Sequence, residues 1–591
     1  DMYSAENAGL VKFDFLGLKT LTVINNTQKL VSKIDETFNI ESISYEDQKV
    51  FDLLSSGNTV GLFQVESAGM REALVQMKPN HIEDIIALVA LYRPGPMSNI
   101  PTYNDCKNGK QTPDYLHPLL EDILKPTYGV IIYQEQVMQI AQKLSGFTAG
   151  QADLLRRAMG KKKRAELEKQ KQGFIAGALK NGIAKDVAAG IFLKIEPFAE
   201  YGFNKSHAAA YAIISYQTAF LKTYYPKEFI AASMTMDISN QNKLSEFYEE
   251  LKRLDIKVTR PDINECFADF KTVDNKFYYA LGGIKAVGYE AISNVVNERT
   301  KNGKFKSISD FLDRVNPKDM NKLQLEGLVK AGAFDNLNEN RQSLFDSIPN
   351  FIIKTKNIFD NKSANQIDLF SDEEATQNDI INNIEDWKFE ERLSKEFEAV
   401  GFFISDHPLN QFTEIFDDYK IKDYVNFNLN DEIKDANIAA TLLKIQERKT
   451  AKGNSYAVMK LTDLTSVFEL FIFSDILELN REILKEGNSL ILTLVKSVSN
   501  DENRFKRINV QKIGSLKDLF NSPINEVSFD IKSDEEVSEI LELLKEEGKT
   551  TININIINDK KILKFKLKNT RNLDRKSLNL IRKREISCTI N

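Results

Sequence analysis

The chain has 591 residues, of which 42% are hydrophobic and 28% are charged, and its formal net charge is −6. These fractions are typical of globular proteins, and at roughly 150 residues per domain the length favours about four domains. No apolar run approaches the roughly 20 residues of a membrane span, so we expect no membrane partner. The three cysteines and four histidines lack the spacing of a disulfide framework or a zinc site, which favours a reducing, cytoplasmic location.

The first predicted element is a strand in the run "GLVKFDFLGLKTL", which starts at Gly9. Because strand side chains alternate between two faces, Lys12 and Asp14 share one face, opposite the apolar residues. A half-buried strand with a weak surface ion pair explains this pattern, and so does a strand that directs Asp14 at a metal and Lys12 at an anion. We expect strand and turn over residues 1 to about 20. Since the chain begins close to this strand and without methionine, we also expect a fragment whose beginning is missing.

Helical patterns dominate from about residue 22 to 260. In "NHIEDIIALVALYRPGP" the apolar residues recur at helical spacing, and Asn80 can cap the helix with Glu83 three places later. The Pro-Gly-Pro sequence at 94–96 stops this helix and leaves Arg93 at its C-terminal end.

Charge is unevenly distributed along the chain. Residues 143–227 contain 15 Lys and Arg against 6 Asp and Glu, whereas residues 368–398 contain 11 acidic residues against 3 basic ones. In the basic stretch "GFTAGQADLLRRAMGKKKR", Thr148 and Gln151 form a predicted capping box and Gly160 is placed to end the helix. A solvated surface explains most lysine runs, but clustered cations also neutralise phosphates. The candidates for phosphate contact are Arg156, Arg157, Lys161, Lys162 and Lys163.

A second candidate site opens the helix in "YGFNKSHAAAYAIISYQTAFLKTYYP". Ser206 resembles an N-cap, and Lys205 and His207 flank the helix start, where free N–H groups and the helix dipole favour an anion. A packed helix with a hydrogen-bonded histidine is the alternative, and the three alanines at 208–210 support close packing. Both interpretations hold together if the helix body is buried and its N-terminus is functional.

From about 275 to 340 we expect short helices broken by glycines. The run "ALGGIKAVGYEAISNVVNER" resembles one helix-hairpin-helix motif, whose backbone N–H groups contact a phosphate without reading sequence. The usual first glycine of such a hairpin is replaced by Ala286, and "LEGLVKAGAFDNL" could form an accompanying hairpin. Packing of helices and turns without a ligand is the alternative. The predicted hairpin residues are Ile284, Lys285, Ala286, Val287 and Gly288.

From about 345 to 400 the sequence becomes polar, Asn-rich and acidic, and we expect a linker with short helices. The run "QIDLF" exposes two large apolar residues in this linker, which calls for an explanation. A short peptide that docks Leu369 and Phe370 into a pocket, oriented by Gln366 and Asp368, provides one. A linker that packs on its own domain is the alternative.

Five β-rich runs between about 437 and 515 suit a small closed barrel of the oligonucleotide-binding (OB) type. The last 70 or so residues read strand, helix, strand, strand, helix, strand, which is a split β-α-β order on a small sheet. The predicted fold class is therefore multidomain: mainly α in the N-terminal half, then a small β-barrel and a small α/β domain.

Together these residues resemble the α subunit of bacterial DNA polymerase III, the C-family of replicative polymerases. The stretches that carry the resemblance are "LVKFDFLGLKTL", "VGLFQVESAGMREAL", "IALVALYRPGPM", "PTYGVIIYQEQVMQIAQ", "LLRRAMGKKK", "GFNKSHAAAYAIISYQT", "GIKAVGYEAI", "LVKAGAFD" and "GFFISDHPL". The resemblance implies five domains. They are a palm remnant over 1–20, fingers over 21–270, a clamp-binding region with helix-hairpin-helix and acidic linker over 271–425, an OB-fold over 430–515, and a C-terminal α/β domain over 516–591 that resembles a τ-binding domain.

The resemblance also implies functional roles. Asp14 matches one of three catalytic carboxylates that hold two Mg²⁺ ions, and the other two acids precede Asp1 in the family. The basic residues named above, with Lys12, Arg93 and Lys205 to His207, would grip the incoming deoxynucleoside triphosphate (dNTP) and the primer-template DNA. The peptide "QIDLF" matches a sliding-clamp (β) motif, and the other implied partners are the clamp-loader τ subunit and, for the full-length protein, a proofreading exonuclease subunit.

Two functions follow from these expectations. The first is the C-terminal part of a DNA-directed DNA polymerase, which we expect to be inactive alone because two of its carboxylates are missing. The second is a non-catalytic protein that binds DNA and tethers the sliding clamp.

Overall fold

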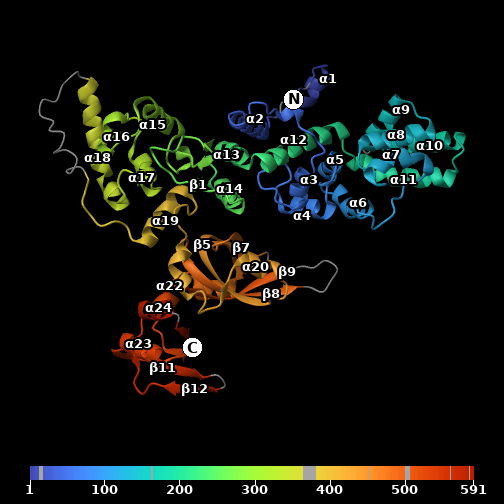
Figure 1. The fold of residues 1–591 in the computed structure, drawn as a ribbon. Coiled ribbons are helices and arrows are strands. Elements are labelled where there is room, and N and C mark those ends of the chain that lie inside the picture. The colour runs from blue at the N-terminus through green and yellow to red at the C-terminus, as the bar shows by residue number, and fades with distance from the viewer. Residues whose placement is uncertain are drawn as a thin grey trace. The chain divides into compact units, whose positions relative to one another are not determined.

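The computed structural model describes residues 1–11, 13, 17–160, 164–363, 381–450, 453–498, 506–558, 561–584 and 586–590. The chain divides into two compact units, namely Asp1–Leu328 with Lys354–Ile367, and Val329–Ile353 with Asp368–Asn591. The described part of the first unit is mainly helical and that of the second is rich in strands (Figure 1). This confirms the predicted fold class at the level of a helical N-terminal half and a sheet-rich C-terminal region.

The N-terminus begins with a helix, so the prediction of strand and turn over the first 20 residues is wrong for Met2–Asn7. Asp1 provides the physical reason, because its carboxylate accepts hydrogen bonds from the backbone N and the hydroxyl of Ser4 at 3.3 and 3.0 Å. Lys12 and Asp14 lie outside the described residues. The first helices are α1 Met2–Asn7, α2 Lys19–Val31, α3 Gln48–Ser55, α4 Ala68–Met77, α5 Ile82–Leu91 and α6 Ile100–Lys107, with 3₁₀ turns η1 Ile40–Ser42 and η2 Pro96–Asn99.

A helical bundle follows, and its core contains the buried rings of Phe174 and Phe192. The predicted capping box is confirmed at the start of α9: the Gln151 amide oxygen accepts from the Thr148 backbone N at 2.9 Å, and the Thr148 hydroxyl accepts from the Gln151 backbone N at 3.3 Å. The helix is described as far as Gly160, and because residues 161–163 lie outside the described residues, the expected end at this glycine stays a prediction. The bundle consists of η3 Pro118–Leu120, α7 Glu121–Leu124, η4 Lys125–Thr127, α8 Gln134–Ser145, α9 Ala149–Gly160, α10 Arg164–Lys180 and α11 Lys185–Tyr201.

Helix α12, Lys205–Tyr224, packs on α5 and α3 and is followed by α13 Pro226–Met236 and α14 Gln241–Arg253. Its N-cap is Asn204 and not Ser206, because the Asn204 amide oxygen accepts from the His207 backbone N at 2.8 Å. The N-cap of α5 is likewise His81 and not Asn80. In both cases the neighbouring polar residue provides an alternative cap that residue type alone does not distinguish.

The remainder of the first unit contains a small sheet of order β1-β3-β2 and the predicted short helices. Its strands are β1 Val258–Thr259, β2 Lys271–Val273 and β3 Lys276–Tyr278, followed by η5 Leu281–Gly283, α15 Tyr289–Asn302, α16 Ile308–Arg314 and α17 Lys322–Lys330. Helix α18, Arg341–Ser363, then occupies much of the region where we expected a linker. That prediction is wrong there because Leu344, Ile348 and Phe351 are buried at helical spacing.

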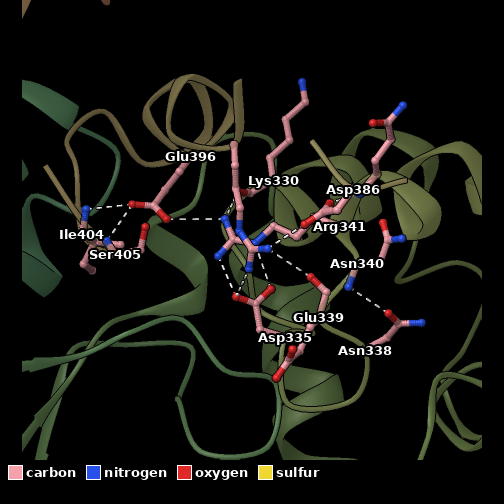
Figure 2. A network of polar contacts seen from close by, with 12 residues as sticks. Lys330, Asp335, Asn338, Glu339, Asn340, Arg341, Asp386, Glu396, Ile404 and Ser405 are labelled. Atoms are coloured by element: carbon pink, nitrogen blue, oxygen red, sulfur yellow. Dashed lines mark hydrogen bonds and ion pairs between the residues drawn. The ribbon is translucent and has the colours of Figure 1, made fainter. Parts of the chain in front are cut away.

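A buried polar network fastens the start of α18 to helix α19, Phe389–Val400, in the second unit (Figure 2). Arg341, which is 3% exposed, forms two hydrogen bonds with the Asp335 carboxylate at 2.8 and 2.7 Å and a longer one with Glu396 at 3.4 Å. The other carboxylate oxygen of Glu396 accepts from the backbone N of Ile404 and of Ser405, both at 2.8 Å. Buried charges of this kind stabilise only when they are paired and hydrogen-bonded, as these are.

The five predicted barrel strands are present, with the order β7-β6-β5-β8-β9 and a core of aliphatic residues. The strands β7 and β9 lie close together, but no hydrogen-bonded register between them is recorded in the described residues, so closure of the barrel stays a prediction. This region consists of η6 Pro408–Ile415, β4 Ile421–Lys422, α20 Tyr424–Leu429, β5 Asp435–Lys449, β6 Ser455–Thr462, β7 Val467–Phe473, α21 Ser474–Asn480, β8 Ser489–Val498 and β9 Lys506–Ser515.

The last residues form a four-stranded sheet with the order β12-β11-β10-β13, in which β10 and β11 are parallel and joined by a helix. Their order along the chain matches the predicted split β-α-β sequence. The elements are α22 Leu516–Asn521, β10 Glu526–Ile531, α23 Asp534–Leu543, β11 Glu547–Asn558, β12 Lys561–Lys566, α24 Arg575–Lys583 and β13 Ser587–Ile590. Throughout the described chain, we find no helix whose length and apolar character would let it cross a bilayer.

Candidate nucleic-acid interface

Two short segments run side by side and bring the starts of α8 and α12 together. The backbone N of Gln134 donates to the carbonyl of Phe203 at 3.0 Å, and the backbone N of Phe203 donates to the carbonyl of Ile132 at 3.1 Å. The Gln134 side chain also donates to the carbonyl of Gly202 at 3.0 Å. Backbone hydrogen bonds therefore hold together two segments that lie about 70 residues apart in the sequence.

Arg93 reaches this junction from the end of α5. Its guanidinium carbon lies 4.3 Å from the centre of the Phe203 ring, and its Nε donates to the carbonyl of Ala90 at 3.0 Å. Partial burial lowers the pKa of Arg93 from its ordinary value. An arginine stays charged at neutral pH even so, and it stacks well on an aromatic face.

The N-terminus of α12 is partly occupied by a carboxylate of the chain itself. Glu135 accepts from the backbone N of Lys205 at 3.1 Å and from the Asn204 amide at 2.9 Å. The expected backbone site for an external anion is therefore already engaged, and the side chains of Lys205 and His207 remain as candidates. The Lys205 ammonium lies 5.4 Å from the ring centre of the buried Tyr133.

A row of aromatic rings follows the first two turns of α12. The exposed His207 ring lies 5.2 Å from Phe203 and 4.5 Å from Tyr211, and Tyr211 lies 5.4 Å from Phe63. Phe63 is held by α12 because its backbone N donates to the Thr218 hydroxyl at 3.2 Å. Exposed aromatic faces next to cations are suited to stacking on nucleobases.

Arg156 and Arg157 share one carboxylate. Asp153 pairs with Arg156 at 2.8 Å and with Arg157 at 2.7 Å, and the hydrogen bonds from Arg156 are the main cause that lowers the pKa of Asp153. Arg156 also donates to the Gln134 side chain at 3.4 Å, so it faces the junction. The structure thus brings Arg93, Arg156, Lys205 and His207 to one locality, whereas no contact of Arg157 with the junction is recorded in the residues described. Lys161, Lys162 and Lys163 lie outside the described residues.

The predicted hairpin has the geometry of a tight backbone turn. Ala286 adopts a φ of 65°, the left-handed conformation for which glycine is usual. Ile284 and Val287 are buried, whereas Lys285, Ala286 and Gly288 are exposed. A Cβ atom at Gly327 in α17 would lie 2.7 Å from the carbonyl of Lys285, so the hairpin and α17 pack closely together.

The outer face of β5, β6 and β7 carries aromatic and basic side chains in cross-strand rows. Arg448, Tyr456 and Phe473 are paired in one row, and the next rows contain Phe471 and then Lys444 with Lys460. Phe471 and Phe473 are 52% and 50% exposed, although both are apolar. The same rows also contain Glu469, so the surface is not uniformly basic.

The described residues contain no group of three or more His, Cys, Asp or Glu side chains that could hold a metal ion. This finding concerns only the part of the chain that the structure describes. The predicted ligand Asp14 and the predicted clamp residues Gln366, Asp368, Leu369 and Phe370 lie outside that part.

Two family models match parts of the chain. Residues 20–182 match the bacterial DNA polymerase III alpha subunit finger domain, and residues 255–344 match a helix-hairpin-helix motif. Curated relatives cover much more of the chain. DNA polymerase III subunit alpha of Caulobacter vibrioides is 41% identical over 512 residues, which are 85% of this chain and 44% of that protein. The subunit of Rickettsia bellii is 39% identical over 608 residues, which are 96% of this chain and 51% of that protein.

The chain belongs to the DNA polymerase III alpha subunit family. It spans about half the length of the curated relatives it matches. Arg93 and Arg156 fall inside the finger-domain match, and Ile284 to Gly288 fall inside the helix-hairpin-helix match. Lys205 and His207 follow the finger-domain match and join the site through the backbone pairing of Phe203.

The sequence interpretation did not include the aromatic residues Phe203 and Tyr211 among the site residues of this alpha-subunit surface. Tyr211 follows His207 by four residues on α12, a spacing that places both on one side of the helix, whereas Phe203 precedes the helix and joins them through its backbone pairing. That spacing was available in the sequence. Phe471 and Phe473 were treated as part of a barrel strand, although strand alternation puts both on the face opposite its buried residues.

Proposed function

We propose that the chain is part of a replicative DNA polymerase that transfers nucleotidyl groups from dNTPs to a primer 3′-hydroxyl under the direction of a template. The observation that carries this proposal is the junction of Arg93, Arg156, Lys205 and His207, which includes two residues of the finger-domain match. Cations on an aromatic row suit a ligand that has both phosphates and a base.

The divalent metal is the cofactor of this proposal. Two Mg²⁺ ions would activate the primer hydroxyl and stabilise the leaving pyrophosphate. Asp14 would be one ligand, and further carboxylates would have to come from sequence outside these 591 residues. The role of the described residues is to bind and orient the nucleotide and the DNA.

The remaining modules would keep the polymerase on its DNA. Residues 284–288 would contact a phosphate through the hairpin backbone, and the outer face of β5 to β7 would follow single-stranded template. Gln366, Asp368, Leu369 and Phe370 would dock on the sliding clamp, and residues 516–591 would contact the clamp-loader τ subunit. The full-length protein would also bind a proofreading exonuclease subunit, all in the bacterial cytoplasm.

Primer extension tests the catalytic proposal. We expect no templated synthesis by the 591-residue chain alone, and synthesis once the chain is joined to an upstream half taken from a relative. The control is the same joined protein with Asp14→Asn, which should lose synthesis and still bind DNA. Templated synthesis by the 591-residue chain alone would show that the proposed division of the metal ligands is wrong.

The second candidate is a non-catalytic protein that binds DNA and tethers the clamp. It rests on the hairpin around Ala286 and on the aromatic face of β7, because neither needs a metal ion to bind DNA. Primer extension by the joined protein separates the two functions. Synthesis that requires Asp14 supports the polymerase, and no synthesis supports the non-catalytic protein.

A further inference from the structure

A basic groove lies in the first unit, away from the residues assigned above. It has a volume of about 410 Å³ and is formed by the start of α13, the segment 255–259 and the turn between β2 and β3. Three lysines from these three elements line it against one carboxylate. Its charged residues are Lys227, Lys257, Lys276 and Asp255.

The three groove lysines differ from other lysines nearby. No ion pair of Lys227, Lys257 or Lys276 is recorded within the described residues, whereas the Lys252 ammonium lies 3.0 Å from the Glu249 carboxylate. Lys271 likewise lies 4.6 Å from the centre of the Phe267 ring. Most of the positive charge of the groove is therefore not neutralised by the described chain itself.

The groove is also held in shape. The Lys227 ammonium donates to the backbone carbonyl of Asn275 at 3.1 Å and to its side-chain oxygen at 2.5 Å. Asp274 and Asn275 both have positive φ, 49° and 63°, as a tight two-residue hairpin turn requires. Strand β1 pairs in parallel with β3, so the segment that carries Lys257 is fixed to the same hairpin.

We propose that this groove binds consecutive phosphates of a DNA backbone, in addition to the nucleotide and hairpin sites. Lysines act as point charges toward phosphate and carry no information on sequence, which suits a contact that must slide along DNA. The choice of DNA over an acidic protein rests on the proposed function, since the first unit carries the finger match and most of the helix-hairpin-helix match.

The test compares the full chain with the double variant Lys257→Ala/Lys276→Ala, using a fluorescein-labelled DNA duplex over a range of salt concentrations. Removing two phosphate contacts should lower the slope of log affinity against log salt by about 2 and weaken binding at least about tenfold at low salt. Lys227 is left unchanged because it also holds the turn. Circular dichroism and thermal unfolding check that the variants fold.

Two further variants make the comparison specific. The matched control Lys252→Ala/Lys271→Ala removes the same charge from lysines outside the groove, and it should change the slope much less. Asp255→Asn removes the only carboxylate of the groove and should tighten binding, and asparagine tolerates the φ of 53° at this position.

Each other outcome has a definite meaning. Equal effects of the groove variant and the matched control would overturn the proposal while leaving the proposed function intact. Poly-glutamate binding that is lost in the groove variant, with DNA binding unchanged, would assign the groove to an acidic protein instead. An unchanged chain that binds no duplex would refute the proposed function itself, and the groove proposal with it.

Discussion

The ammonium of Lys222 lies 2.6 Å from a carboxylate oxygen of Glu250, and the two side chains are 1% and 4% exposed. The same ammonium donates to the carbonyls of Asn58 and Val60 at 2.9 and 2.8 Å. One buried cation thus ties α12 and α14 to the loop that carries Phe63. The aromatic row on α12 depends on that loop, so a charge in the core fixes the geometry of a surface site.

We expect Lys222→Met to destabilise the first unit by about 3–5 kcal/mol, because it leaves Glu250 buried without this partner. Arg253 also binds Glu250, at 2.7 Å, and should keep the loss near the lower end of that range. The double variant Lys222→Met/Glu250→Leu should recover most of the stability, since it removes both buried charges. Urea unfolding measures both variants, and a double variant no more stable than Lys222→Met would contradict this explanation.

The packing of Arg93 on Phe203 leads to a prediction about nucleotide binding. In an active polymerase that contains this chain, Arg93→Lys should raise the KM for dNTPs roughly tenfold, because lysine keeps the charge but loses the planar stack. Arg93→Ala should raise the KM further. The matched control is Arg157→Lys, which changes an exposed arginine that is paired with Asp153. Steady-state kinetics with a varied dNTP concentration separates an effect on KM from one on kcat.

The exposed aromatic residues of β7 lead to a prediction about single-stranded DNA. Phe471→Ala/Phe473→Ala should weaken binding of an oligothymidine by about 1–3 kcal/mol per stacked base. Leu479→Ala is the control because Leu479 is an 85% exposed apolar residue on α21, the next helix. Fluorescence anisotropy measures both. Equal affinities of the two variants would show that the aromatic face of the barrel does not contribute to DNA binding.

Local patterns predicted the parts of this fold that depend on neighbouring residues. The Thr148–Gln151 box was predictable because the partners lie three residues apart. The contact of Arg93 with Phe203 was not, because it joins positions 110 residues apart through the pairing of two loops. The hydrogen bond from the backbone N of Lys205 to Glu135 could not be predicted either, because these residues also lie far apart in the sequence. Sequence patterns named most of the charged site residues, whereas only tertiary packing revealed which of them lie together.

The backbone of Ala286 leads to a prediction about stability. A non-glycine residue at a φ of 65° is strained, so Ala286→Gly should stabilise the protein. The expected gain is about 1 kcal/mol, reduced by the greater freedom of glycine in the unfolded chain. Ala176→Gly, at an exposed position inside α10, is the control and should destabilise by a similar amount. Thermal unfolding measures both, and a lower Tm for Ala286→Gly would show that the hairpin is not strained there.

Cys266 leads to a prediction about thiol reactivity. It is fully buried, its Sγ donates to the carbonyl of Arg260 at 3.1 Å, and burial raises the pKa of its thiol to about 12. Because only the thiolate reacts, labelling by a thiol reagent at about pH 8 should be far slower than for a free cysteine, with its pKa of about 8.5. The rate should rise with pH up to about 12. Mass spectrometry of labelled peptides follows each site, with urea-unfolded chain as the control. Rapid labelling of Cys266 in the folded protein would show that the segment 260–267 opens readily.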